Sequence, residues 1–358
     1  MKTPYSDDKG VVGFIKSFVV AMIRSRHGVL AEFATLLRFQ PGTKGFHRRY
    51  ERLVSLMNHL KQAYKEEVSS HLKTLPGLTL GIFDDTTIKK AGRCFEGEGV
   101  HHDHITGKNY NGFKVCSTAI YRGGKTAVVE TTFSSKQESK IDLFKESFNS
   151  LCHEELAPDV FLFDTWYSLK PVLKLIEEHC KLYVTRLRSN RVTFVDDECL
   201  SLKLLAINFS HHQYCPVRVH GRTYWVIDIR LNLSGLGEQR VIVSKDSVHA
   251  RPVFLTTNSE TFSTKFVLIL YLKRFQIELF FKDAKQFLNL ETFQCRTKEK
   301  WGLHFLFVQL VHWFIQRRNS ISKVVRGIRE SLDKIQSYIN ENQLFNKFID
   351  ALKKRCQM

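Results

Sequence analysis

The sequence predicts an α/β fold in which a mixed sheet with helices is interrupted by a block of β-strands and preceded by a helical segment. Three patterns support this prediction. Apolar residues recur at three- and four-residue steps over residues 11–73. Apolar strand-like runs alternate with helical patterns over residues 78–185. The helical pattern then disappears over residues 188–258 and returns at Thr264.

The N-terminal segment, residues 1–75, is expected to be a small basic helical domain. Gly28 and the Gln40-Pro41-Gly42 break divide it into several short helices. It contains 13 Lys and Arg residues against 6 Asp and Glu residues. This excess fits DNA binding, although a solvated helical face has the same composition.

Residues 76–187 are predicted to form the first part of the α/β core. Its strands are expected at 78–83, 112–121, 125–132, 160–163 and 181–185, with helices at 141–152 and 169–179. Residues 188–260 are expected to form a β-strand insertion domain, because β-branched runs there are separated by glycine turns. Residues 261–320 would complete the core, and residues 321–358 would form a helical tail.

Charge and cysteine usage limit the class of protein. The chain has 54 Lys and Arg residues against 36 Asp and Glu residues, which favours a polyanionic partner without distinguishing DNA from RNA or an acidic membrane. Its eight cysteines form no CxxC pair, so reduced thiols and a cytoplasmic protein are expected. The apolar run 14–23 is too short for a bilayer span of about 20 residues, so no membrane association is expected.

Aspartates follow two of the predicted core strands. Asp84 and Asp85 follow residues 78–83, and Asp164 follows residues 160–163. Ligands of α/β proteins bind at this edge of the sheet, although aspartate is also a common helix cap and turn residue. The side-chain alternation of the strand favours Asp84 as the functional residue, whereas a motif Asp-Thr-Thr would favour Asp85.

A third acidic residue lies on a helix predicted at 271–290. Tyr271, Arg274, Glu278 and Lys285 fall within an arc about 60° wide on a helix that turns 100° per residue. The adjacent arc is apolar and would pack on the core: Ile277, Phe280, Phe281, Ala284, Phe287 and Leu288. A salt-bridged surface helix would also place Arg274 four residues before Glu278.

The order of these residues resembles a known family. Tyr271-x2-Arg274-x3-Glu278-x6-Lys285, preceded by Asp84 and Asp164, is similar to the Tyr-Arg-Glu-Lys signature of DDE-type insertion-sequence transposases of the cut-and-paste group. The resemblance covers approximately residues 78–320. It implies a ribonuclease H-like catalytic domain. It also implies a β-strand insertion between the second aspartate and the glutamate, which is typical of this group.

The resemblance also implies the chemistry. Asp84, Asp164 and Glu278 would be the catalytic residues and would hold two Mg²⁺ ions, for which Mn²⁺ would substitute, with Asp85 as the alternative first ligand. Three converging carboxylates need such cations. The protein would bind the terminal inverted repeats of its element, cleave there, and transfer the 3′-hydroxyl into target DNA, with a homodimer in the synaptic complex.

Several further residues are candidates for contact with double-stranded DNA. The resemblance implies phosphate contacts by Tyr271, Arg274 and Lys285, and the basic residues Lys282, Arg186 and Arg188 extend this set. The resemblance also implies that an aromatic residue of the insertion assists release of the element through a hairpin. Trp225 would have this stacking role, although a tryptophan in a strand is more often part of a core. His101-His102-Asp103-His104 lacks a distant second ligand pair and is expected to be a polar loop.

Two other functions remain open at this stage. A catalytically decayed or domesticated transposase would keep DNA binding without cleavage, but would be expected to lack a carboxylate or part of the signature. A metal-dependent DNA nuclease without strand transfer would have the same catalytic residues. Strand transfer depends on how target DNA is captured, which these motifs do not determine.

Overall fold

The computed structural model describes residues 10–25, 28–37, 39, 44–90, 95–96, 99–103, 107–134, 139–195, 198–247, 249–316 and 343–356. The predicted tail therefore lies outside the described residues up to residue 342, as do Arg26, Arg38 and His104 of the basic and histidine-rich segments. None of the helices in the described part of the chain combines the length and apolar character that a bilayer crossing needs.

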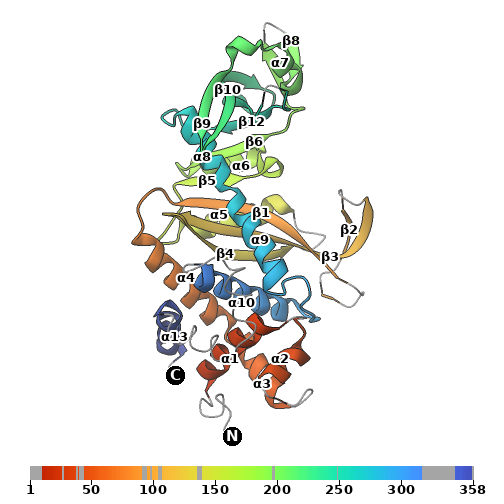
Figure 1. Cartoon of the computed structure of the whole chain (residues 1–358), viewed down its shortest axis with the longest axis vertical. Helices are drawn as coiled ribbons and strands as arrows, with labels where there is room; N and C mark the ends of the chain where they lie inside the picture. Colours follow the sequence, from red (N-terminus) through yellow and green to blue (C-terminus); the bar gives the residue numbers. More distant parts are fainter. Residues whose placement is uncertain are drawn as a thin grey trace.

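The N-terminal segment is helical, as predicted. Its four helices are α1 (Val11–Arg24), α2 (Leu30–Leu36), α3 (Lys44–Ser55) and α4 (Met57–Lys73). They pack on the rest of the molecule through apolar residues, and the ring of Phe18 in α1 lies 4.9 Å from that of Phe307 in α10 (Lys298–Gln316). In Figure 1, α1, α2 and α3 lie at the bottom of the view, below the sheet, and α4 leads up to it. They share one hydrophobic core with the α/β part of the chain.

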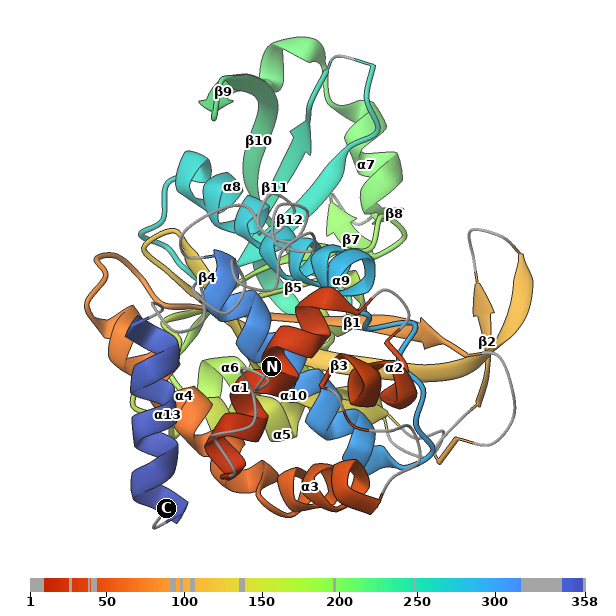
Figure 2. The ribbon, with the colours of Figure 1, turned by 60° about the horizontal axis from the view of Figure 1, so that its bottom comes forward.

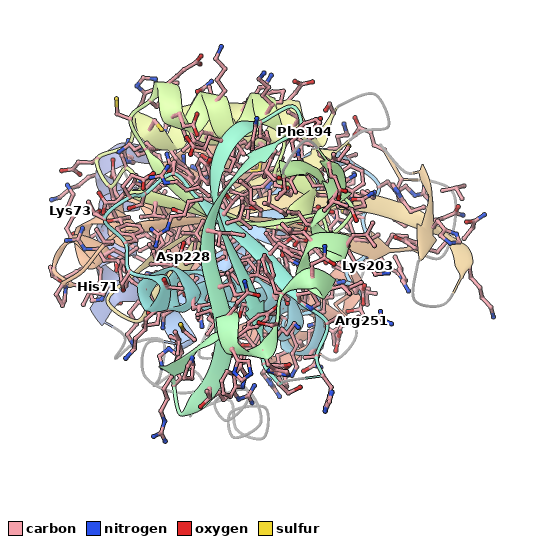
Figure 3. The ribbon with its side chains drawn as sticks, turned by 90° about the horizontal axis from the view of Figure 1, so that it is seen from above. His71, Lys73, Phe194, Lys203, Asp228 and Arg251 are labelled. Atoms are coloured by element: carbon pink, nitrogen blue, oxygen red, sulfur yellow. The ribbon has the colours of Figure 1, made fainter. Side chains whose placement is uncertain are left out.

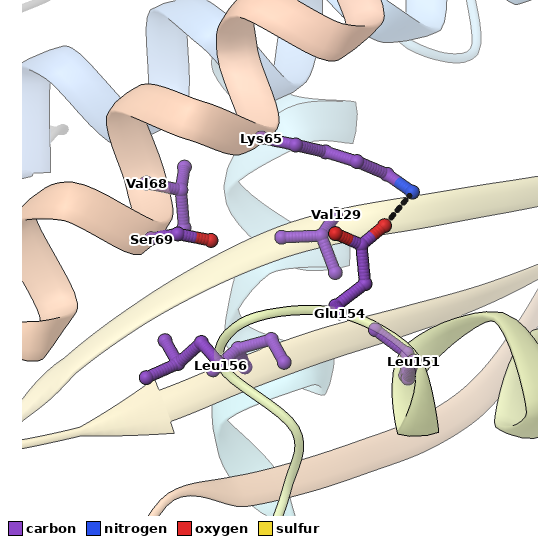
Figure 4. Close-up of a pocket in the computed structure, with 8 residues that line it drawn as sticks. Lys65, Val68, Ser69, Val129, Leu151, Glu154 and Leu156 are labelled. Carbon is purple, nitrogen blue, oxygen red and sulfur yellow. Dashed lines mark hydrogen bonds and ion pairs between the residues drawn. The ribbon is translucent and has the colours of Figure 1, made fainter.

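An ion-pair network also holds α4 against the sheet. Lys65, with its side chain 12% exposed, binds Glu130 on β4 (Lys125–Ser134) and lies 2.9 Å from Glu154 in the loop after α5 (Lys140–Cys152). Figure 4 shows Lys65 reaching from α4 towards Glu154. Opposite charges that are largely removed from water cost free energy when one partner is lost, so α4 is fixed to the core at this point.

The central sheet has the strand order β4-β3-β1-β5-β6. Its members are β1 (Leu80–Lys89), β3 (Lys108–Arg122), β4, β5 (Val160–Phe163) and β6 (Leu182–Leu187). The meander β1-β3-β4 is antiparallel, whereas β1, β5 and β6 are parallel. This is the ribonuclease H-like arrangement predicted from the sequence. Helices α5 and α6 (Lys170–Glu178) pack behind the sheet, while α8 (Thr264–Lys273) and α9 (Phe275–Phe287) cross its front (Figure 1).

Three local predictions were wrong. The first strand does not end before Asp84, because β1 pairs with β3 along its whole length to Lys89. The segment around His101 is not a loop but strand β2 (Gly99–Asp103), which forms with β3 the protruding hairpin in Figure 2. The helical pattern begins at Thr264, as predicted, but the helix expected over 271–290 is divided at Arg274 and ends at Phe287.

The residues between β6 and α8 extend the same sheet. They form β7 (Val192–Val195), β8 (Glu198–Ser201), α7 (Leu202–Asn208), the 3-10 turn His211–Gln213, β9 (Cys215–Val219), β10 (Arg222–Leu233), β11 (Gly237–Lys245) and β12 (Val253–Thr257). Strand β12 pairs with β6, which makes the sheet continuous. A purely β block was expected, but α7 buries Leu202, Leu205 and Ala206 in a small second core.

A hydrogen bond joins this strand block to α8, and an ion pair within the block holds its acceptor, Asp228. Asp228 on β10 accepts from the guanidinium of Arg240 at 3.0 and 2.6 Å and from the hydroxyl of Thr264, the first residue of α8, at 2.6 Å. Figure 3 shows Asp228 near the middle of the view from above, with Arg251 and Lys203 on one side of the molecule. The contact fixes where α8 begins, and therefore where the residues of α9 meet the sheet.

Candidate active site

Asp84 and Asp164 lie side by side at the end of the parallel part of the sheet. The pairing of β1 with β5 ends at Phe83 and Phe163, so the two aspartates are the next residues on neighbouring strands. Such strands are about 4.8 Å apart. Asp164 begins the 3-10 turn Thr165–Tyr167, but its carboxylate does not cap that turn. The side chain of Asp164 therefore does not have the helix-capping role that was the alternative to a functional one.

The carboxylate of Asp84 faces α9 and is largely buried. Its Oδ2 lies 3.3 Å from Nη1 of Arg274, and its Oδ1 accepts from the backbone N–H of Asp85 at 2.9 Å. Burial raises the pKa of Asp84 to about 7, and this effect outweighs the lowering by Arg274. Asp85 and Glu278 add to the increase because they are also acidic. The carboxylate thus sits where additional positive charge would be stabilising.

Asp85 points to the opposite face of the sheet, because successive side chains of a strand alternate. Its carboxylate oxygens both lie 2.7 Å from Nζ of Lys140 on α5, and Oδ1 also accepts from the hydroxyl of Tyr167 at 2.9 Å. These partners hold the side chain between the sheet and α5. The structure therefore brings Asp84, and not Asp85, to the face where Glu278 lies.

Glu278 lies on α9, which packs on the sheet as its apolar residues predict. Ile277, Phe280 and Ala284 are almost fully buried, whereas the side chain of Glu278 is 43% exposed. Its carboxylate lies 2.7 Å from Nη2 of Arg274. The periodicity of the sequence thus places this glutamate correctly at the edge of the buried stripe.

Arg274 stands at the junction of α8 and α9 and connects the acidic residues. Its guanidinium contacts both Asp84 and Glu278, and its Nε is buried without a hydrogen-bond partner. Burial alone would lower the pKa of Arg274, but Tyr271 and the three carboxylates, Asp164 included, raise it. One arginine therefore experiences the field of all three predicted catalytic residues.

The donor set fits a divalent cation, although the carboxylates are not gathered around one point. Mg²⁺ prefers carboxylate oxygens, which Asp84, Asp164 and Glu278 all offer. Among the described residues, no three His, Cys, Asp or Glu side chains lie close enough together to hold a metal ion. Arg274 supplies the compensating positive charge instead.

Comparison with known proteins identifies the chain. The family model described as a transposase DDE domain matches residues 75–314, which is more than half of the sequence. The chain belongs to the transposase DDE domain family. No curated protein matches it significantly. Among solved structures, the NurA nuclease from Sulfolobus solfataricus is 10% identical, with 78% of this chain and 96% of that chain covered and a TM-score of 0.27.

The matched DDE domain includes the basic residues predicted to bind DNA. Lys282 and Arg186 are exposed, Arg188 is exposed beside Trp166, and Tyr271 is buried next to Arg274. Lys285 does not project freely, because its Nζ lies 2.8 Å from the carbonyl oxygen of Thr87 and 3.1 Å from Glu291. It ties α9 to β1 in this structure.

Trp225 lies away from the carboxylates, in strand β10 of the insertion. It pairs with Lys245 and Pro216 on the neighbouring strands and packs partly buried against the small second core. This environment is typical of a tryptophan that stabilises the fold, and less typical of one on which a DNA base stacks.

Three residues near the site were not selected from the sequence. Lys140 and Tyr167 hold Asp85, and Trp166 stands exposed next to Asp164. The motif Asp164-Thr-Trp-Tyr was visible, and a tryptophan in a turn was a usable signal. Lys140 gave no such signal, because its contact with Asp85 joins residues 55 positions apart.

Proposed function

We propose that this protein is a DNA transposase that binds the terminal inverted repeats of its element, cleaves at the ends, and transfers the 3′-hydroxyl into target DNA. The observation that carries the proposal is the grouping of acidic residues around Arg274. Asp84 and Glu278 bind its guanidinium, and Asp164 follows the strand next to Asp84. Family membership supports the same assignment.

Asp84, Asp164 and Glu278 would hold two Mg²⁺ ions, with Mn²⁺ as a substitute. When bound, such ions activate a water or hydroxyl nucleophile and stabilise the leaving oxygen. The oxygen donors and the raised pKa of Asp84 support this role. Asp85 is not proposed as a ligand, since Lys140 and Tyr167 already occupy its oxygens.

The basic residues around the carboxylates would position the DNA backbone. Arg274 has a planar fork of donors that matches a phosphate, and its Nε has no partner inside the protein. Lys282 and Arg186 are exposed and would bind phosphates of the duplex. Burial raises the pKa of Tyr271, so its hydroxyl would donate a hydrogen bond to a phosphate rather than ionise.

The partners follow from this chemistry. The substrate would be double-stranded DNA, first the inverted repeats of the element and then the target. Two ends must be joined for cut-and-paste transfer, so we propose a homodimer in the DNA complex. Lys285 would join the phosphate contacts if it released Thr87 and Glu291.

Cleavage of an end duplex tests the proposal. Binding, cleavage and joining are measured for wild type, Glu278→Gln and Glu146→Gln with Mg²⁺, a duplex that carries the element boundary, and a target duplex. Glu146 is a matched control because it is an exposed glutamate on α5, behind the sheet. Wild type and Glu146→Gln should nick at the boundary, and Glu278→Gln should lose at least a hundred-fold in rate, on the order expected for a residue that acts on the reacting atoms.

Three results would count against the proposal. Binding without cleavage by any of the three proteins would favour a decayed transposase that only binds DNA. Cleavage without joining to a target duplex would favour a metal-dependent nuclease. Undiminished cleavage by Glu278→Gln would show that the predicted acidic residues are not the catalytic ones.

A further inference from the structure

Trp166 is an exposed aromatic side chain directly beside the candidate active site. It lies two residues after Asp164, and 57% of its surface is accessible. Tryptophan is usually well buried in folded proteins, because its ring gains much from leaving water. A tryptophan that stays exposed next to a predicted catalytic residue is therefore a candidate for binding a ligand.

The turn that carries Trp166 is held rigidly. The backbone N–H of Tyr167 donates to the carbonyl oxygen of Asp164 at 3.0 Å, and Arg191 donates to that of Ser168 at 2.9 Å. The next side chain, Tyr167, is buried against Phe83, with ring centroids 4.8 Å apart. Trp166, the residue before it in the same turn, is exposed instead. A ring fixed in this way loses little conformational freedom when it binds a partner.

Two cations lie over the ring at cation-π distance, and a base that stacks there would displace the exposed one, Arg188. Nζ of Lys140 lies 5.3 Å and Cζ of Arg188 lies 5.2 Å from the centroid of Trp166. Lys140 is itself anchored by Asp85, whereas Arg188 is exposed. An aromatic platform surrounded by basic groups is the combination that binds single-stranded nucleic acid, in which bases stack and phosphates pair with cations.

We propose that Trp166 is the stacking platform for one unpaired nucleobase of the DNA strand bound at Asp164, with Arg188 on the phosphate of that nucleotide. The base must be unpaired, because the faces of bases in a duplex are covered by their neighbours. This inference rests on the proposed function, since it takes DNA as the substrate. It adds a preference for frayed or single-stranded DNA at the cleavage point.

Binding of a fluorescent single strand tests this inference without cleavage. The probe is an oligothymidylate with one central 2-aminopurine, titrated with the full-length protein in EDTA. Wild type should quench 2-aminopurine, because stacking on an indole quenches it. Trp166→Ala should lose the quenching and weaken binding on the order of ten-fold, as expected for one lost stacked base. Trp166→Phe should keep most of both.

Two controls separate stacking from other effects. Phe194→Ala removes another exposed aromatic ring, on β7 of the insertion, and should leave the quenching unchanged. Affinity for a blunt duplex should change less than two-fold in Trp166→Ala, and the thermal unfolding midpoint should match that of wild type. Quenching by Trp166→Ala equal to that of wild type would overturn the inference, as would an equal loss of single-strand and duplex affinity. Failure of wild type to nick with Mg²⁺ would count against the proposed function alone.

Discussion

Replacing each of the two neighbouring aspartates by asparagine separates their roles. Asp85→Asn removes the charge that faces Lys140, and both side chains are largely buried, at 17% and 19% exposure. Breaking a buried ion pair costs about 3–5 kcal/mol. The asparagine carbonyl can still accept one of the hydrogen bonds, so we expect a loss of about 2–3 kcal/mol, which is a decrease in Tm of roughly 5 °C.

Asp84→Asn should behave in the opposite way. Asp84 contributes only one contact of 3.3 Å to Arg274, which keeps its shorter contact of 2.7 Å with Glu278. The Tm of Asp84→Asn should therefore stay within about 2 °C of that of wild type. Metal-dependent cleavage should disappear in Asp84→Asn and persist in Asp85→Asn when each is assayed well below its own Tm.

Thermal unfolding followed by a cleavage assay provides the measurement. The reasoning fails if Asp85→Asn unfolds like wild type and cannot cleave, while Asp84→Asn cleaves normally. That pattern would mean that Asp85 is the metal ligand and that its contacts with Lys140 and Tyr167 are given up when DNA binds.

Three further changes test the packing around the site. Burial lowers the pKa of His304 to about 3, so the neutral ring contributes its full stabilisation above pH 6.5, and this contribution is lost as the pH falls towards 3. Urea unfolding at pH 5 should therefore give a free energy of unfolding about 2 kcal/mol lower from this group alone. His304→Phe should remove that part of the pH dependence of stability. Lys65→Met should cost about 2 kcal/mol near neutral pH, since it leaves Glu130 with fewer partners. Burial would raise the pKa of Glu130, but Lys61 and Lys65 lower it overall. The destabilisation caused by Lys65→Met should therefore shrink as the pH falls below 4.5 and Glu130 is protonated. A destabilisation independent of pH would contradict the ion pair. Gly112→Ala should destabilise the protein strongly, because a Cβ would lie 2.2 Å from a carbonyl oxygen of β1, whereas Gly10→Ala, with nothing within 4 Å, should change Tm little.

The sequence predicted those parts of the fold that depend on local periodicity. The buried stripe of α9 follows from the spacing of Ile277 and Phe280, and it places Glu278 at the edge of that stripe. The end of the first strand was misjudged because Asp84 begins a polar run that is typical of a turn. Pairing with β3, which lies later in the chain, keeps this run extended.

The details of the site depend on contacts between distant segments. The side chain of Arg274 is long enough to reach partners on several sides of its helix. Only the packing of α9 on β1 brings its guanidinium to Asp84, 190 positions away in sequence. The same holds for Lys140 and Asp85. Periodicity gives the face on which a residue lies, but it does not give the partner that crosses from another element.

The junction of β6 with β12 gives the strand block one point of entry into the central sheet. Leu187 and Phe254 are paired across these strands, so the chain leaves the central sheet and returns to it at neighbouring positions. Most of the small second core comes from residues between those two points. The block is nevertheless not a removable domain, because Val226 and Ile242 belong to the main hydrophobic core and Asp228 holds the first residue of α8. A change in the block would therefore be transmitted to the helices that carry Arg274 and Glu278.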